Sequence, residues 1–100
     1  MSDYEYINNP SHYNKPGKKE CIVLMEELFG MYWVAIFCIL NCFKYLYRAG
    51  DKPDEDYMRD KNKAAWYINR AKGYIPFLKH KQAMKVSNMI ILVGEEYDYD

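Results

Sequence analysis

The sequence predicts an all-α fold: one compact domain of three or four helices, built around a central apolar helix and expected to form an oligomer. A chain of 100 residues has the size of a single domain. Half of its residues are apolar and 28% are charged, which is the composition of a globular protein. Apolar residues recur at helical intervals, and Gly or Pro separates the segments in which they do so.

The first predicted helix covers residues 18–29. It follows an irregular segment, residues 1–17, in which Pro10 and Pro16 lie within turn-forming sequences. Gly30 is a suitable terminator. The expected apolar stripe consists of Cys21, Leu24, Met25 and Leu28, with the glutamates Glu20, Glu26 and Glu27 outside it.

The second predicted helix, residues 31–49, is expected to be the central element. Its first half is apolar nearly all round, and Gly50 ends it. The uncharged run over residues 28–43 has 16 residues, whereas a helix that spans a membrane needs about 20. We therefore expect a buried core helix and no contact with a membrane.

The third predicted helix covers residues 54–72. Acidic residues fall in its first turn, and Arg70 and Lys72 fall in its last turn, as the helix dipole favours. Its apolar stripe consists of Tyr57, Ala64, Ile68 and Ala71. Together with the first two helices it forms the predicted nucleotide-binding core, residues 18–73.

A fourth helix is predicted over residues 77–93, opened by Pro76. Residues 89–93 are apolar and β-branched enough to form a buried strand instead. We expect residues 74–94 to be the oligomerisation element, because an apolar surface is left over there: Tyr74, Phe77, Met84 and Met89. Residues 95–100 form an acidic tail.

The net charge is zero, but the charges are unevenly distributed along the chain. Residues 57–94 carry eight basic residues against one acidic residue, and residues 95–100 carry four acidic residues. No segment combines basic and aromatic residues as known nucleic-acid modules do, so nucleic acid is not the expected partner. No phosphate-binding loop or cofactor motif is present, and we expect no cofactor.

The three cysteines, Cys21, Cys38 and Cys42, are an odd number in apolar surroundings, and no signal peptide precedes them. This pattern predicts buried thiols in a reducing compartment. Cys38 and Cys42 lie four residues apart without a second cluster of Cys or His, so no metal site is expected.

Two polar stripes are expected to face each other. Asn41, Lys44, Tyr45 and Arg48 share one face of the second helix, and Asp56, Asp60, Lys63 and Tyr67 share one face of the third. Two helices joined by a short turn pack antiparallel, so these stripes can meet. They could form a salt-bridge network that fixes the helix register, or a pocket in which cations hold phosphate oxygens and tyrosine stacks on a base.

Four sequence blocks stand in the order of a known family: Asn9-Pro10-Ser11-His12-Tyr13; Glu20-Cys21-Ile22; Asn41-x-x-Lys44-Tyr45-x-x-Arg48-Ala49-Gly50-x-Lys52; and Asp60-x-x-Lys63-Ala64-x-Trp66-Tyr67-Ile68. They resemble the SaV-like family of small bacteriophage proteins, and also the C-terminal module of a phage nucleotide kinase that lacks a phosphate-binding loop. The resemblance implies a phage origin, action in the host cytoplasm and a nucleotide ligand. The binding residues that it implies are His12, Tyr13, Asn41, Lys44, Tyr45, Arg48, Lys52, Asp60, Lys63 and Tyr67.

We therefore expect a non-catalytic phage protein that binds a nucleotide or another phosphorylated small molecule and so sequesters it, for example a host immune signal. Two alternatives stay open. One is a nucleoside monophosphate kinase, for which Asp56 and Asp60 are the candidate carboxylates. The other is a protein-interaction module that inhibits a host enzyme through the acidic tail. In each case a homo-oligomer is expected, with pockets at subunit boundaries.

Overall fold

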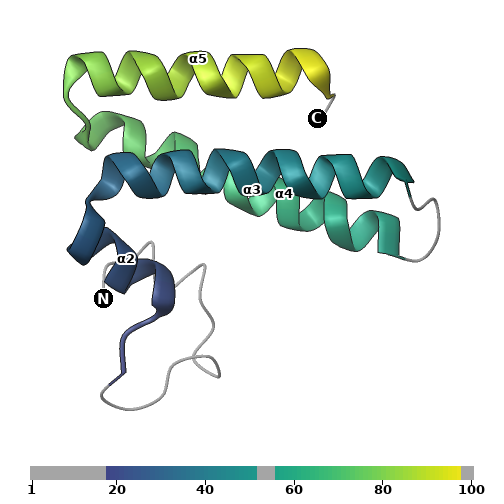
Figure 1. The fold of residues 1–100 in the computed structure, drawn as a ribbon, viewed down its shortest axis with the longest axis horizontal. Coiled ribbons are helices and arrows are strands. Elements are labelled where there is room, and N and C mark those ends of the chain that lie inside the picture. The colour runs from purple at the N-terminus through teal and green to yellow at the C-terminus, as the bar shows by residue number, and fades with distance from the viewer. Residues whose placement is uncertain (1–17, 52–55, 98–100) are drawn as a thin grey trace.

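The computed structural model describes residues 18–51 and 56–97. Within these residues the fold is all-α, with four α-helices and no strand (Figure 1). The helices are α2 (Cys21–Phe29), α3 (Met31–Asp51), α4 (Asp56–Tyr74) and α5 (His80–Glu96), and a 3-10 turn, η2 (Ile75–Phe77), joins the last two.

The long helices α3 and α4 form the main helix pair. They pack side by side along most of their length, and α3 also contacts α2 and α5 (Figure 1). On α4 the buried positions Ala64, Ile68 and Ala71 are spaced by four and three residues and so share one face, where the two alanines allow the helix axes to approach. Tyr57, which the sequence places on the same stripe, is partly exposed instead.

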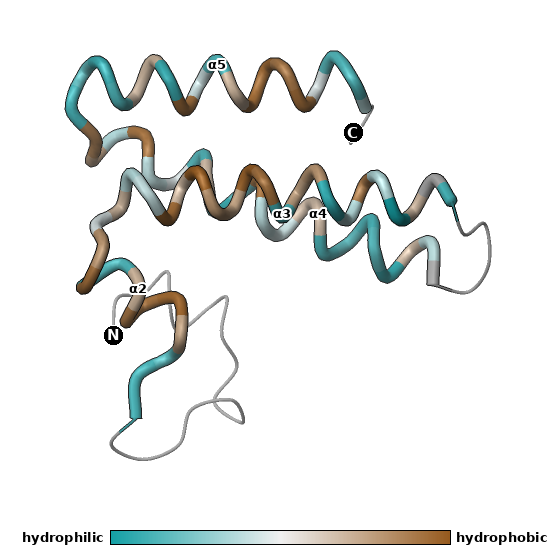
Figure 2. Tube along the Cα trace, in the orientation of Figure 1, coloured by the Kyte–Doolittle hydropathy of each residue, from teal (hydrophilic) through white to brown (hydrophobic). Residues whose placement is uncertain are grey.

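The core lies between α3, α4 and α5. Its α3 members are concentrated in the first half of that helix, where hydrophobic residues prevail, and hydrophilic residues follow toward its end (Figure 2). On α5, Val86, Ile90 and Val93 cover the core at helical spacing. The buried core residues are Val34, Ala35, Cys38, Ile39, Cys42, Leu46, Ala64, Ile68, Ala71, Tyr74, Val86, Ile90 and Val93.

Three predictions about the C-terminal third are corrected. Residues 89–93 are helical, so the strand alternative is wrong. Pro76 lies within η2 and does not open a helix, because Leu78 and Lys79 are extended before α5 begins at His80. Tyr74 and Met89 are not left-over surface: Tyr74 is buried and Met89 packs against the core.

The first helix also differs from the prediction. It begins at Cys21, and its contact with the core is made by Ile22 and Met25. Leu24, Leu28 and Cys21 are exposed, so of the expected stripe only Met25 faces the core. The helix ends at Gly30, whose φ of 90° and ψ of 157° favour glycine because residues with a Cβ rarely adopt this backbone conformation.

The other two cysteines are buried, as the sequence predicts. Burial raises the pKa of Cys38 to about 12 and that of Cys42 to about 11, so both thiols stay protonated at neutral pH. No helix in residues 18–51 or 56–97 is both long and apolar enough to cross a membrane.

Candidate ligand-binding site

The two predicted polar stripes meet around a pair of tyrosine rings. Tyr45 of α3 and Tyr67 of α4 stack with centroids 5.8 Å apart and planes inclined by only 12°. Phe37 meets the Tyr67 ring edge-on from α3 at 6.1 Å. Aromatic pairs at these distances prefer such offset or edge-on geometry, so the rings are held in place by packing between the two helices.

Three cationic groups surround the Tyr45 ring. Lys44 Nζ lies 4.5 Å, Lys63 Nζ 5.3 Å and Arg48 Cζ 5.5 Å from the ring centroid. Each is within the range in which the face of an aromatic ring attracts a cation. We call the five residues Lys44, Tyr45, Arg48, Lys63 and Tyr67 the cation–tyrosine cluster.

One carboxylate borders the cluster. Asp60 is only 3% exposed, and its Oδ2 lies 3.9 Å from Arg48 Nε. That distance makes an ion pair but is too long for a hydrogen bond. Among the residues whose side chains the structure describes, three cations face this one neighbouring acid, and that positive excess suits an anionic ligand better than a closed salt-bridge network.

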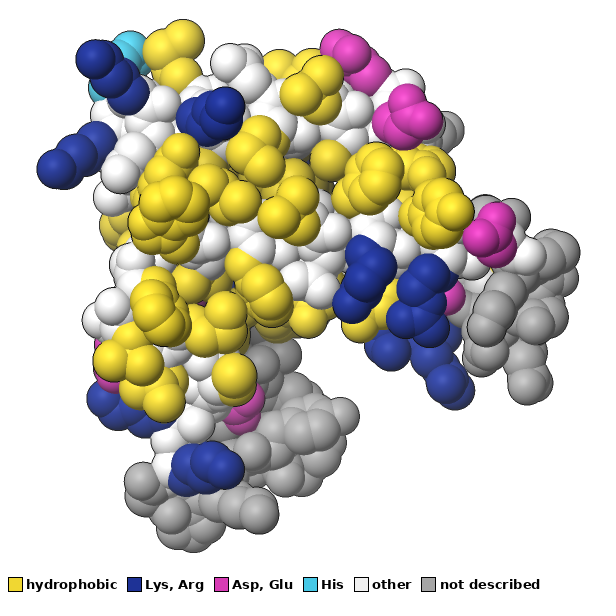
Figure 3. All heavy atoms as spheres, in the orientation of Figure 1, with side chains coloured by type: hydrophobic (Ala, Val, Ile, Leu, Met, Phe, Trp, Pro, Cys, Tyr) yellow, Lys and Arg dark blue, Asp and Glu magenta, His cyan; other side chains and the backbone are white. Residues whose placement is uncertain are grey.

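The cluster lies on the surface and is reachable from solvent. Lys44, Arg48 and Lys63 are exposed, whereas Tyr45 and Tyr67 are half-buried. Lys and Arg side chains gather where α3 ends and α4 begins (Figure 3). Burial raises the pKa of Tyr67, with a smaller contribution from Tyr45, so the Tyr67 hydroxyl remains a hydrogen-bond donor at neutral pH.

Asn41, another predicted site residue, bonds to its own helix. Asn41 donates a 2.9 Å hydrogen bond from Nδ2 to the carbonyl oxygen of Phe37, one turn back in its own helix. His12, Tyr13 and Lys52 lie outside the described residues, as does the side chain of Asp56. In the part of the chain that the structure describes, no three His, Cys, Asp or Glu side chains are grouped as metal ligands are.

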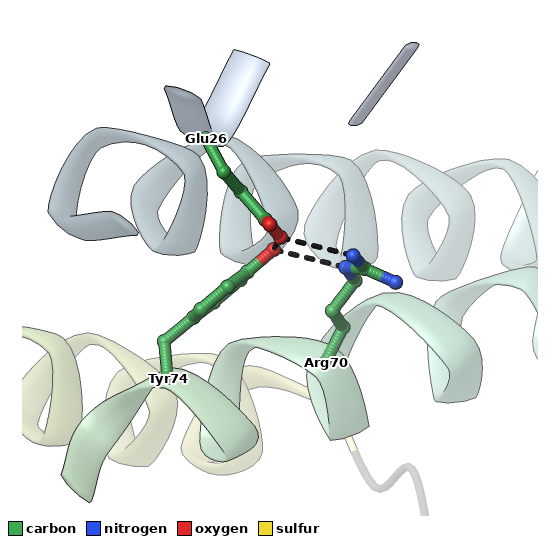
Figure 4. A network of polar contacts seen from close by, with 3 residues as sticks. All are labelled: Glu26, Arg70 and Tyr74. Atoms are coloured by element: carbon green, nitrogen blue, oxygen red, sulfur yellow. Dashed lines mark hydrogen bonds and ion pairs between the residues drawn. The ribbon is translucent and has the colours of Figure 1, made fainter. Parts of the chain in front are cut away.

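A second polar network was not predicted from the sequence. Arg70 of α4 donates from Nη2 to Glu26 Oε2 of α2 at 2.9 Å, and from Nε to the Tyr74 hydroxyl at 2.9 Å (Figure 4). The Tyr74 hydroxyl in turn donates to Glu26. Burial and the hydrogen bond to Glu26 hold the pKa of Tyr74 well above its ordinary value.

This Glu26–Arg70–Tyr74 network corrects the prediction for Arg70. The guanidinium is 1% exposed and pairs with Glu26, and because α4 extends to Tyr74, its last turn holds Lys72 and not Arg70. Glu26 and Arg70 are 44 positions apart in the sequence, and no local spacing connects them. The network joins α2 to α4 and is structural.

Comparison with known proteins identifies a family but no relative of known activity. A family model described as a protein of unknown function, DUF3310, matches residues 7–69. This span contains the whole cation–tyrosine cluster and excludes η2 and α5. No curated protein and no solved structure matches the chain.

Proposed function

We propose that this chain, which belongs to the DUF3310 family, binds a nucleotide or a similar phosphorylated small molecule at the cation–tyrosine cluster. The observation that carries the proposal is the arrangement of Lys44, Arg48 and Lys63 around the Tyr45 ring. Like charges held this close repel one another, and a bound phosphate would replace that repulsion with charge-assisted hydrogen bonds.

The aromatic part of the cluster suits the other half of a nucleotide. A nucleobase is flat and apolar on its faces, and the Tyr45–Tyr67 stack offers rings at the same place as the cations. The Tyr67 hydroxyl can donate to a sugar or phosphate oxygen. Asp60, buried beside Arg48, would orient the guanidinium toward the ligand.

The proposal extends to the biological role that the phage resemblance implies. A protein of this kind would act in the host cytoplasm by holding a nucleotide away from its receptor, with an immune signalling nucleotide as one candidate. Sequestration needs only tight binding, which a positive cluster with stacking rings can supply. We further propose a homo-oligomer as the binding species.

The experiment that tests binding also separates it from the kinase alternative. The protein is incubated with a panel of nucleotides, with and without ATP, re-isolated, heat-denatured, and the released molecules are identified. Recovery of an unaltered nucleotide supports binding, and a diphosphate product formed only with ATP supports the kinase. If no nucleotide is retained and none is converted, the proposal is wrong.

Arg48→Ala is the matched variant for this experiment. A charge-assisted contact to phosphate is worth about 1.5–3 kcal/mol, so affinity should fall about 10- to 100-fold. Arg48→Lys should retain part of the affinity that Arg48→Ala loses. Lys85→Ala removes an exposed charge on α5 outside the cluster and should leave affinity unchanged.

A thermal-melt cycle on the ligand-free protein separates the binding site from a structural ion pair. If Arg48 serves mainly to neutralise the buried Asp60, Arg48→Ala strands that carboxylate and lowers the melting temperature strongly, and Asp60→Asn in the same chain restores it. If Arg48 serves a ligand, the two changes are nearly independent. Strong coupling together with unchanged nucleotide affinity would leave only the structural role.

A further inference from the structure

Helix α3 carries an exposed apolar ridge that the core does not use. Trp33, Leu40 and Tyr47 are seven residues apart and are 62%, 59% and 58% exposed. Phe37 and Phe43 flank them and are also exposed. Hydrophobic side chains accordingly form a broad band over α3 and the neighbouring part of α5 (Figure 3). We call Trp33, Phe37, Leu40, Phe43 and Tyr47 the α3 ridge.

A shallow groove continues the ridge toward α5. It has a volume of about 160 Å³, and Leu40 and Phe43 of α3 line it together with Met89 and Leu92 of α5. Leu92 is 63% exposed although it lies beside this apolar wall. The apolar surface is therefore continuous across two helices.

The exposed area is large enough for a stable interface. The four aromatic residues of the ridge are about half exposed on average, which at roughly 200 Å² per side chain leaves about 400 Å², and Leu40 and Leu92 add to it. A standard interface buries about 800 Å² per partner, of which somewhat more than half is apolar. The ridge and groove supply that apolar share.

We propose that the α3 ridge binds the same ridge of a second copy of this chain, with the two α3 helices antiparallel about a two-fold axis at Leu40. The ridge is symmetric about that residue: Trp33 and Tyr47 lie seven positions to either side, and Phe37 and Phe43 three. A two-fold axis therefore places Trp33 against Tyr47 of the second copy and Phe37 against its Phe43. Such self-complementarity is what an isologous dimer requires.

The charges select the antiparallel orientation over the parallel one. Residues 28–43 carry no charge, whereas Lys44 and Arg48 lie at one end of the ridge. Parallel helices would set these cations against their own copies, and like charges facing each other across an interface are unfavourable. Antiparallel helices set them against the uncharged end that begins at Trp33.

The dimer would complete the cation–tyrosine cluster. Because Trp33 of the second copy then lies beside Tyr47 and Lys44, its indole forms an aromatic wall next to the cations. This part rests on the proposed function: we infer that each nucleotide site takes a stacking residue from the other copy.

Sedimentation of the full chain without nucleotide tests the interface. The wild type should be a dimer at tens of micromolar. Leu40→Glu should be a helical monomer, because a dimer of this variant would bury two unpaired carboxylates at the two-fold axis. Met84→Glu is the matched control, since Met84 is 53% exposed on α5 and does not line the groove. A monomeric wild type, or a dimer lost in Met84→Glu and kept in Leu40→Glu, would overturn the proposal.

Cysteine pairing tests the register without relying on the charge variant. In a Cys21→Ser background, the Trp33→Cys and Tyr47→Cys proteins should form a mixed disulfide with each other and little with themselves. Homodisulfides in each protein alone would show a parallel arrangement and refute the register.

Equilibrium dialysis with a mixture of AMP, GMP, CMP and UMP tests the composite site. Trp33→Ala that remains dimeric should bind at least tenfold more weakly. A wild-type dimer that binds none of the four overturns the composite site and leaves the interface standing. If dimeric Trp33→Ala binds as tightly as the wild type, Trp33 is not part of the nucleotide site and only that part of the proposal is refuted.

Discussion

Replacing Glu26 by Gln should cost this protein a large part of its stability. The substitution keeps the shape of the side chain but removes the charge that neutralises Arg70, which is 1% exposed. Removing one partner of a buried ion pair typically costs about 3–5 kcal/mol, because the other charge stays in a medium that solvates it poorly. The whole free energy of unfolding of a typical domain is only about 5–15 kcal/mol.

The neighbouring residue supplies the matched control. Glu27 pairs with Lys19 at 2.7 Å, but both side chains are about half exposed to water. Exposed pairs contribute about 0.2–1 kcal/mol, so Glu27→Gln should change the stability little. The two variants make the same chemical change at adjacent positions of α2. The difference between their free energies of unfolding therefore measures the effect of burying the ion pair.

Tyr74→Phe should lower the free energy of unfolding by more than Glu27→Gln does and by less than Glu26→Gln does. It removes one hydroxyl that donates to Glu26 and accepts from Arg70, but leaves the ion pair itself in place. Hydrogen bonds to charged groups are worth about 1.5–3 kcal/mol.

Urea denaturation followed by helical circular dichroism measures all three variants at neutral pH. For a domain of this size, a loss of 3 kcal/mol corresponds to a fall in melting temperature of about 12–24 °C. Arg70→Met combined with Glu26→Gln should be less destabilised than the sum of the single changes. The reasoning is refuted if Glu26→Gln and Glu27→Gln are equally stable.

Three further predictions concern the backbone and the thiols. Gly30→Ala should destabilise the protein by about 1–3 kcal/mol in the same denaturation assay because φ is 90° at this position, although there is room for a Cβ, which would meet nothing within 4 Å. The control is Gly73→Ala, inside α4, which should be neutral or stabilising. Equal effects of the two substitutions would argue against a backbone cause. At pH 8 a thiol reagent should modify Cys21 rapidly, and Cys38 and Cys42 only after urea is added. The pKa of Cys38 is raised from 9 to about 12, so the unfolded chain loses the Cys38 thiol proton at a lower pH than the folded protein does. Between pH 9 and pH 12 this thiol should therefore lower the free energy of unfolding by at most about 1.4 kcal/mol per pH unit, and Cys38→Ala should show a smaller decrease. An unchanged dependence on pH in Cys38→Ala would contradict the raised pKa.

The four helices follow from local sequence, but of their ends only those on either side of Gly30 are as predicted; α3 continues through the predicted terminator Gly50 to Asp51, and α4 through Gly73 to Tyr74. The beginning of α3 after Gly30 and the common face of Lys44, Tyr45 and Arg48 depend only on spacing along one helix, and the structure shows both. The closeness of Tyr45 and Tyr67 follows as well, because a short connection forces α3 and α4 to be antiparallel. Spacing along one helix does not fix which cation pairs with Asp60; the packing of the two helices pairs it with Arg48.

The sequence by itself determined the all-α class and the helix faces that carry the cation–tyrosine cluster. Only the tertiary structure decided that Arg70 is buried with Glu26 and Tyr74, that Cys21 and Leu24 face outward, and that the α3 ridge stays uncovered. The physical reason is the range of the interactions. Helix periodicity is set by neighbours three and four residues away, whereas burial of a charge or exposure of a ridge depends on which helices lie against it.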